Sequence, residues 1–372
     1  MMEEDKDVTL STLSVDSPSI KVTEVVRDGD TLTFIIISQK LSGTGEYHVD
    51  RTYEDFEWLQ HHLFSEEDVP GLQGVIFPPL PAKAQVNVSP KVIKQLGFLA
   101  MGQDWQPYCA ALQTYLHQVA ANSTLRKNRA LEVFLTSLEP PGRQKVRKGI
   151  FNRLSQAVEG MRKEGHKDVD DFFQAERDRN LVLTGCTKTA AERFLDVVLS
   201  EQRIAVACGH FSTALQLCVD RGDDADQRAF NKICVKLSEV LDSMRKHIGE
   251  AAENNVSSLG LGLDLDCRYQ EAEKEMLFRR TCKLMELEAA SKNAEKAKPG
   301  KKAAMEELKK GAEEEFEHIS GVAKLEIARL HSMRVEMLRR ALIQWCEKQL
   351  ITARESADRY KQLLQDFKGM AV

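Results

Sequence analysis

The hydrophobic positions follow two different periods along the chain, and the first is the two-residue period of a β-strand. Apolar residues alternate over 20–25, a run rich in β-branched residues covers 31–38, and alternation returns at 47–49. Turn-forming residues lie between these runs, at 27–30 and 43–45. Short alternating runs joined by tight turns predict a three-stranded antiparallel meander.

The period then changes to that of a helix. Phe56, Leu59 and Leu63 recur at steps of three and four residues, which predicts a helix of about three turns. The stretch 77–83 holds three prolines, which fix φ and remove backbone donors, so we expect neither a helix nor an inner strand there. Two further helices are predicted through 112–119 and 131–138.

The last two hundred residues read as long helices. Between 169 and 367 the only proline is Pro299, which leaves long stretches without a helix breaker. Three helices are expected: about 168–249 with a break near 220–223, about 265–297 after a Gly-rich connector at 259–262, and about 302–367 after a tight turn at 298–301.

The last of these helices carries an apolar stripe with coiled-coil spacing, interrupted at Arg334. A helix of about 65 residues would be on the order of 100 Å long. Such a helix cannot bury its stripe in one small globule, so we expect it to pack on its neighbours and on a second chain. The predicted dimer stripe consists of Phe316, Ile319, Ile327, Leu330, Met337 and Trp345.

A basic amphipathic segment at 141–166 joins the two patterns. Its apolar positions include Ile150, Phe151 and Leu154, and the basic positions around them include Arg147, Lys148 and Arg153. One interpretation is a helix that inserts its apolar face among anionic lipid headgroups. The other is a linker helix that packs on the long bundle.

The composition argues against a membrane-spanning protein, a secreted protein and an enzyme. No apolar run is long enough for a transmembrane helix, and the acidic start lacks the apolar core of a signal peptide. The eight cysteines form no CxxC pair, so we expect reduced thiols and no zinc site. Catalytic motifs are also missing, so no enzyme activity and no cofactor are predicted.

The charge is unevenly distributed. Residues 1–140 carry 11 basic and 19 acidic side chains, whereas the rest of the chain carries 41 basic and 38 acidic ones. Attraction to an anionic surface is therefore expected from the C-terminal part, and nucleic acid is not an expected partner. The domains predicted from these patterns are a disordered tail at 1–17, an α+β domain at 18–140, the basic linker at 141–166 and an all-α domain at 167–372.

Two motifs in the α+β region resemble those of PX domains. Arg51-Thr52-Tyr53-Glu54-Asp55-Phe56-Glu57-Trp58-Leu59 is similar to the PX strand-to-helix motif, and Phe77-Pro78-Pro79-Leu80-Pro81-Ala82-Lys83 is similar to the PX proline-rich loop. Together with the long helices, they resemble the PX–BAR class of sorting nexins over nearly the whole chain. The resemblance implies an α+β PX domain, with a three-stranded antiparallel sheet plus helices, followed by an all-α BAR domain, a three-helix coiled coil.

Two further motifs resemble the subgroup of sorting nexins five, six and thirty-two. They are Lys167-Asp168-Val169-Asp170-Asp171-Phe172-Phe173 and Leu277-Phe278-Arg279-Arg280-Thr281. In this class the resemblance implies a phosphoinositide pocket, here at Arg51, Tyr53 and Lys83. The pocket departs from the family pattern, since Thr52 stands where the family has an arginine that binds phosphatidylinositol 3-phosphate, and the second family arginine has no counterpart near Tyr108.

The same subgroup has an extension that binds peptide tails of transmembrane cargo. The matching stretch here is 91–108, which is shorter and interrupted by Gly97, Gly102 and Pro107. Its apolar residues could line a groove beside the sheet edge, where a peptide could add a strand. Alternatively, they cover the PX core. The candidate groove residues are Phe98, Leu99, Met101, Trp105 and Tyr108.

Basic residues on the long helices are candidates for contact with a curved bilayer, as the resemblance implies. The alternative is an ordinary solvated surface, because glutamates are interleaved with them. The candidates are Arg279, Arg280, Lys283, Lys298, Lys301 and Lys302.

The function implied is that of a cytoplasmic protein that binds peripherally to early endosome membranes. It would dimerise through the BAR domain, sense or form membrane tubules, and sort transmembrane cargo from endosomes to the Golgi or plasma membrane. The implied partners are anionic or phosphoinositide membranes, another PX–BAR sorting nexin or a second copy of the chain, cargo tails, and dynein–dynactin. The alternative is a membrane-independent coiled-coil adaptor that links cargo to cytoskeletal motors.

Overall fold

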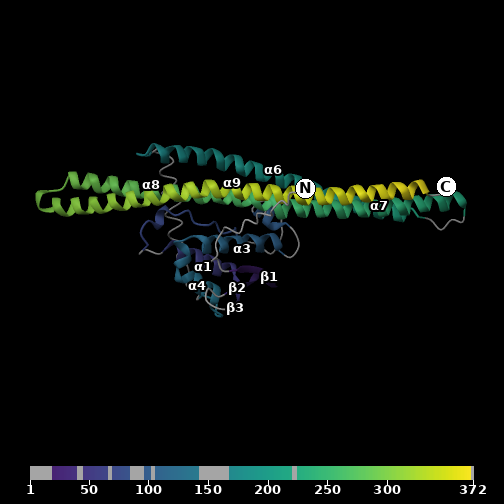
Figure 1. Ribbon diagram of the computed structural model, residues 1–372, viewed down its shortest axis with the longest axis horizontal. Helices are drawn as coiled ribbons and strands as arrows, with labels where there is room; N and C mark the ends of the chain where they lie inside the picture. The colour runs from purple at the N-terminus through teal and green to yellow at the C-terminus, as the bar shows by residue number, and fades with distance from the viewer. Residues whose placement is uncertain are drawn as a thin grey trace, which may run out of the picture. The chain divides into compact units, whose positions relative to one another are not determined.

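A computed structural model describes residues 19–39, 45–65, 69–83, 96–101, 105–141, 167–219 and 224–369 (Figure 1). The described residues form two compact units. The first contains the described residues of 19–72, 77–83 and 108–141. The second contains 167–219 and 224–369, together with earlier pieces of chain at 73–76, 96–101 and 105–107.

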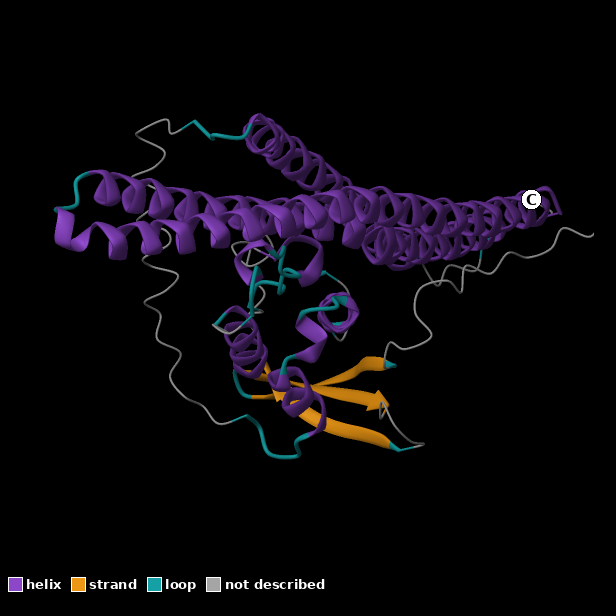
Figure 2. Cartoon of the chain, turned by 60° about the vertical axis from the view of Figure 1, so that its left-hand side comes forward, coloured by secondary structure: helices purple, strands orange, loops and turns teal. Residues whose placement is uncertain are grey.

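The first unit is built on the expected three-stranded sheet (Figure 2). Strands β1 (Ile20–Asp28), β2 (Thr31–Gln39) and β3 (Glu46–Thr52) pair antiparallel in that order. Alternate side chains of β2 are buried, as the period-two pattern predicts. The β1–β2 register shifts between Val22 and Glu24. The predicted meander is confirmed.

Three helices complete this unit: α1 (Tyr53–Phe64), α3 (Gln106–Ala121) and α4 (Arg129–Thr136). Helix α1 begins where the Asp55 carboxylate accepts hydrogen bonds from the N–H and hydroxyl of Thr52, half of a capping box. A 3₁₀ turn at Leu125–Lys127 belongs to this unit, whereas the turn at Gly97–Ala100 belongs to the second unit and the turn at Leu72–Gly74 lies at the boundary between them. The core is aromatic: Phe56 contacts Phe34, Tyr115 and Phe134 at ring-centroid distances of 6.0, 6.3 and 4.9 Å.

The second unit consists of three long helical rods (Figure 1). Helix α6 is Asp171–Leu217, and α9 is Lys302–Gly369. Between them, α7 (Ala225–Asn255) and α8 (Leu261–Glu295) join end to end through a π-helical turn, η4 (Val256–Gly260). A 3₁₀ turn, η5 (Pro299–Lys301), precedes α9.

Contacts along the rods show that neighbours run antiparallel. Ser212 of α6 donates to Ser238 O of α7, and Asn180 near the start of α6 donates to Gln270 O of α8. Helix α9 lies beside α8 and then α7, and its Arg334 donates to Asp266 at 3.0 Å. The three-helix coiled coil predicted from periodicity is therefore present, and the Arg334 that interrupts the stripe is paired within the chain.

The division into helices differs from the sequence prediction. The reversal lies after α6, which ends at Leu217, so the expected break near 220–223 separates two helices rather than interrupting one. The Gly-rich stretch 259–262 is not a loop: it spans the end of η4 and the start of α8, inside a continuous helical run. Its glycines serve packing, because a Cβ on Gly262 would lie 2.6 Å from Ala341 Cβ.

Two apolar clusters hold the rods together. Phe173 of α6, Met276 of α8 and Ile327 of α9 meet in one of them. In the other, Val198 of α6 and Val256 of η4 pack with residues of the 96–101 segment. In the described part of the chain, no helix is long and apolar enough to cross a membrane.

Candidate functional site

The PX-like motif places Arg51 in the core of the first unit. Its side chain is fully buried, and its guanidinium donates to Phe134 O at 2.9 Å, Ser137 O at 2.5 Å and Asp50 O at 2.8 Å. Burial lowers the pKa of Arg51, against the opposing effect of Asp55 and Asp50. With its donors used on carbonyl oxygens, Arg51 ties β3 to the end of α4, and the predicted lipid role of this residue is not supported.

Tyr53 and Lys83 lie together nearby. The Tyr53 hydroxyl donates to Pro81 O at 2.7 Å, and Lys83 Nζ is 5.9 Å from the centre of the Tyr53 ring. The same ammonium group pairs with Glu54. Lys83 is therefore the exposed cation of the predicted pocket, and a carboxylate already neutralises it.

The candidate cargo-groove residues are mostly core side chains. Phe98, Leu99 and Met101 are buried in the second unit, where Phe98 packs on Phe194 of α6 at a centroid distance of 5.8 Å. A Cβ on Gly260 would lie only 2.7 Å from the Phe98 ring, so this glycine makes room for the ring. The expectation that these three residues line an open groove is wrong, because all three are buried, and Phe98 and Met101 pack against Val198 and Val256 of the long helices.

The other two groove candidates differ from each other. Tyr108 is fully buried in the first unit, stacks on Phe34 at 5.6 Å and donates to Ala82 O, so it too is a core residue. Trp105 is half-buried, with φ at +58°. The edge of β1 is also occupied, since Val22 N–H donates to Gln113 of α3 and Ile20 O contacts the His117 ring.

The basic segment expected at 141–166 lies outside the described residues, apart from Pro141. The proposed roles of Arg147, Lys148, Ile150, Phe151, Arg153 and Leu154 therefore rest on the sequence alone.

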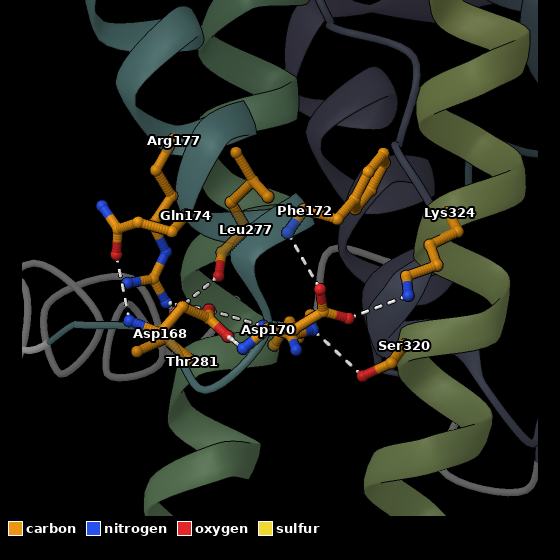
Figure 3. A network of polar contacts seen from close by, with 10 residues as sticks. Asp168, Asp170, Phe172, Gln174, Arg177, Leu277, Thr281, Ser320 and Lys324 are labelled. Carbon is orange, nitrogen blue, oxygen red and sulfur yellow. Dashed lines mark hydrogen bonds and ion pairs between the residues drawn. The ribbon is translucent and has the colours of Figure 1, made fainter.

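A buried ionic network joins the two motifs that carry the subgroup resemblance (Figure 3). Asp168, before α6, accepts from Arg280 of α8 at 2.6 Å and from Arg177 of α6 at 2.9 Å. The Arg280 guanidinium lies between two rings, 3.5 Å from the centre of Phe173 and 4.8 Å from that of Phe316. Burial lowers the pKa of Arg280, and Asp168 opposes that effect.

The network continues to α9. Asp170 caps α6 by accepting from Phe172 N–H at 2.9 Å, and its other oxygen accepts from Lys324 Nζ at 2.8 Å. Arg280 also donates to Ser320 of α9 at 3.0 Å. The start of α6 is thereby fixed to both α8 and α9.

Arg279, the neighbour of Arg280, holds the 73–76 segment instead. It donates to Gln73 O at 3.2 Å and to Val75 O at 2.6 Å, and burial lowers its pKa to about 10. Glu326 of α9 accepts from Ile76 N–H at 3.2 Å. Both arginines are thus structural, and the prediction that they face a bilayer is wrong.

Of the remaining basic candidates, one is paired with carboxylates and three are exposed. Lys283 bridges α8 and α9 by pairing with Glu286 at 2.9 Å and Glu315 at 3.1 Å. Lys298, Lys301 and Lys302 are exposed at the turn between α8 and α9, and none pairs with another described residue. These three lysines, the tip lysines, are the part of the predicted basic set that is available to a ligand.

The predicted dimer stripe is used inside the chain. Phe316, Ile319, Ile327 and Leu330 are buried, Met337 packs against the same cluster, and Trp345 is half-buried and donates to Asn255 at 2.7 Å. These residues hold α9 on α8 and α7, so they leave little apolar surface for a second chain.

Sequence reasoning missed a second apolar stripe on α9. Its members are all exposed and recur at strict steps of three and four residues. The sequence shows the same three- and four-residue spacing in this stripe and in the predicted dimer stripe. Only the burial of the side chains in the structure distinguishes the internal stripe from the exposed one. We call this set the exposed stripe: Ile343, Cys346, Leu350, Ala353, Ala357, Tyr360, Leu364 and Phe367.

Comparisons with known proteins agree with this architecture. A family model described as PX domain matches residues 39–138. Mouse sorting nexin-32 is 27% identical over 391 residues, which cover 96% of this chain and 95% of that protein. Sorting nexin-6 of Pongo abelii is 26% identical over 397 residues, covering 98% and 95%.

The fold is shared with a solved structure as well. The cryo-EM structure of the SNX-BAR Mvp1 tetramer matches with a TM-score of 0.51 at 12% identity, over 93% of this chain and 99% of that one. The chain is thus a PX domain joined to a long helical domain of the BAR type. Over nearly its whole length it is similar to sorting nexin-32 and sorting nexin-6, and its fold is similar to that of an SNX-BAR protein.

Proposed function

We propose that this chain is a peripheral endosomal protein that dimerises through its BAR domain and senses or forms membrane tubules during cargo sorting. The observation that carries the proposal is the exposed stripe of α9. Leu350, Tyr360 and Leu364 are each about half exposed on a helix of 68 residues. Apolar side chains repeated at coiled-coil spacing favour a second helical rod as the partner.

The tip lysines support membrane contact in the same proposal. Three exposed ammonium groups within five residues, free of described carboxylate partners, would attract an anionic bilayer at about 1 kcal/mol each near its surface. The basic segment at 141–166 adds a second membrane contact, proposed from its sequence.

The PX domain is proposed to bind phosphatidylinositol 3-phosphate weakly. A phosphate dianion is best held by paired bidentate donors. Here Arg51 is committed to carbonyl oxygens, Thr52 caps a helix, and Lys83 faces Glu54. We therefore propose that the stronger phosphoinositide contact of the assembly comes from a partner sorting nexin of the type-one or type-two kind. Cargo tails, if the PX domain recruits them, would dock elsewhere than on Phe98 and its buried neighbours.

The test is liposome co-sedimentation of the full chain, alone and with a type-one sorting nexin, on vesicles with and without 3-phosphoinositide. We expect pelleting only with the partner. Replacing the tip lysines by glutamate should reduce it, whereas the same change at Lys188, Lys232 and Lys246 should not. Pelleting of the chain alone with a 3-phosphoinositide preference would contradict the weak-pocket proposal. No pelleting under any condition would favour the motor-adaptor alternative.

A further inference from the structure

A cluster of two glutamates and a histidine lies where the three rods meet, and the proposed function makes no use of it. Glu176 comes from α6, Glu273 from α8 and His331 from α9. His331 Nε2 is 3.6 Å from Glu176 Oε2 and 3.7 Å from Glu273 Oε1. One ligand atom from each residue lies within 4.8 Å of the other two.

The two carboxylate oxygens that face the histidine are buried without a hydrogen-bond partner among the described residues. Glu176 is 8% exposed and Glu273 is 2% exposed. Their other oxygens are occupied: Glu176 Oε1 pairs with Arg179 at 3.5 Å, and Glu273 Oε2 accepts from Asn180 at 3.0 Å. The Glu273 carboxylate is therefore held through one oxygen by Asn180, and both glutamates direct an unsatisfied oxygen into the cluster. A buried unsatisfied oxygen is costly, so the cluster favours a ligand that accepts these lone pairs.

The histidine also offers a lone pair there. The Arg179 guanidinium contacts His331 Nε2, and a guanidinium can only donate, so Nε2 acts as an acceptor. Arg179 is partly exposed. Because its guanidinium contacts His331 Nε2, it occupies the place where a metal ion would bind.

We propose that Glu176, Glu273 and His331 form a binding site for a divalent transition metal that clamps helices α6, α8 and α9 together. One imidazole nitrogen and two carboxylate oxygens suit zinc and its first-row neighbours. Ligand atoms about 2.1 Å from a tetrahedral ion are about 3.4 Å apart, close to the separations of His331 Nε2 from both oxygens. The three residues lie far apart in the sequence, on different helices, so no ligand spacing reveals them.

The experiment titrates chelator-treated full chain with zinc by calorimetry, in a background with exposed Cys186, Cys218 and Cys346 changed to serine to remove thiol ligands. We expect one saturable site. Glu273→Gln and His331→Asn should weaken it by at least about 30-fold, since loss of even an outer-shell partner costs 10–100-fold. Glu317→Gln and His318→Asn, exposed residues of the same helix, should leave it unchanged.

Arg179→Gln supplies a second, opposite readout. Removing the competing guanidinium should tighten zinc binding by about 10-fold, which an adventitious surface site would not do. Zinc should also raise the unfolding temperature of the wild type but not of Glu273→Gln, because a ligand stabilises only the state that binds it. Equal affinity in the wild type and Glu273→Gln, or no tightening in Arg179→Gln, would overturn the assignment.

Discussion

At the scale of single residues, two adjacent arginines of α8, Arg279 and Arg280, bind different parts of the chain. Arg280 points into the rods, where Asp168 and two aromatic rings enclose it, while Arg279 binds the carbonyls of the 73–76 segment. A buried guanidinium needs a complete set of partners, because an uncompensated buried charge is strongly destabilising. The acidic residues before α6 supply the carboxylate partner of Arg280.

This dependence predicts the effect of Asp168→Asn. The substitution keeps the shape of the side chain but leaves Arg280 buried without a counter-ion, so the free energy of unfolding should fall by about 3 kcal/mol. Urea unfolding followed by far-UV circular dichroism measures it. Lys274→Gln, which breaks an exposed pair with Glu271, should cost less than about 1 kcal/mol. Similar losses in the two variants would argue against a buried network.

Glu326 should make the stability of the rods depend on pH. Burial raises the pKa of its carboxyl, although Arg329 and the N–H of Ile76 oppose that rise. A carboxyl group with a raised pKa stabilises the folded state below the unfolded value of 4.5, and that contribution is lost as the pH rises through the folded pKa. Glu326→Gln should therefore gain stability relative to the wild type as the pH is raised.

Thermal unfolding of both proteins at about pH 5 and about pH 8 measures this difference. Glu317→Gln, exposed on the same helix, controls for the loss of one negative charge. A Glu326→Gln difference that shrinks with rising pH would contradict the assignment of a raised pKa.

At the scale of elements, two glycines without side chains allow the long helices to pack closely against each other and against the 96–101 segment. Gly260 receives the Phe98 ring, and Gly262 lets α8 approach α9 at Ala341. The π-helical turn η4 at this point adds a residue to the helical path, which is a local distortion that functional sites often use. The stretch looked like a connector because glycines usually mark loops.

Gly260→Ala tests that role. A new Cβ would lie 2.7 Å from the Phe98 ring, so the ring must move, and we expect a loss of about 1–3 kcal/mol in the free energy of unfolding. Gly311→Ala is the matched control, because nothing lies within 4 Å of its Cβ position on α9. It should stabilise the protein by about 0.5–1 kcal/mol through helix propensity. The opposite order of the two variants would contradict this account of the packing.

At the scale of the whole molecule, the two apolar stripes of α9 have different roles: one stabilises the fold, and the other is available for association with a second chain. The stripe from Phe316 to Leu330 is covered within the chain, and the exposed stripe lies further along the same helix. We therefore expect mutations in the second stripe to alter assembly while leaving the fold intact.

Leu364→Glu should weaken dimer formation at least about 100-fold, because it places a charge in an apolar seam. Mass photometry of the chain, alone and with a partner sorting nexin, measures the dimer fraction. Val335→Glu is the control: Val335 is also exposed on α9 but lies outside the stripe. Unchanged assembly in Leu364→Glu, with the secondary structure intact, would remove the main support for the dimer proposal.

Much of this organisation could be predicted without coordinates. Period-two alternation identified the sheet, and period-3.6 stripes identified α1, α3, α4 and the rods, because each pattern reflects one buried face. The motifs at 51–59 and 77–83 indicated the PX domain. The motifs at 167–173 and 277–281 indicated the subgroup, although nothing in their spacing showed that Asp168 and Arg280 would meet.

A periodic pattern determines which face of a helix is apolar, but it carries no information on what covers that face. For this reason the sequence by itself determined the fold class, the long rods and the PX–BAR resemblance. Only the tertiary structure decided that the first stripe of α9 is internal, that Phe98 lies under the rods, and that 259–262 is continuous helix. The same holds for Glu176, Glu273 and His331, since their proximity arises from antiparallel packing of residues that lie far apart in the chain.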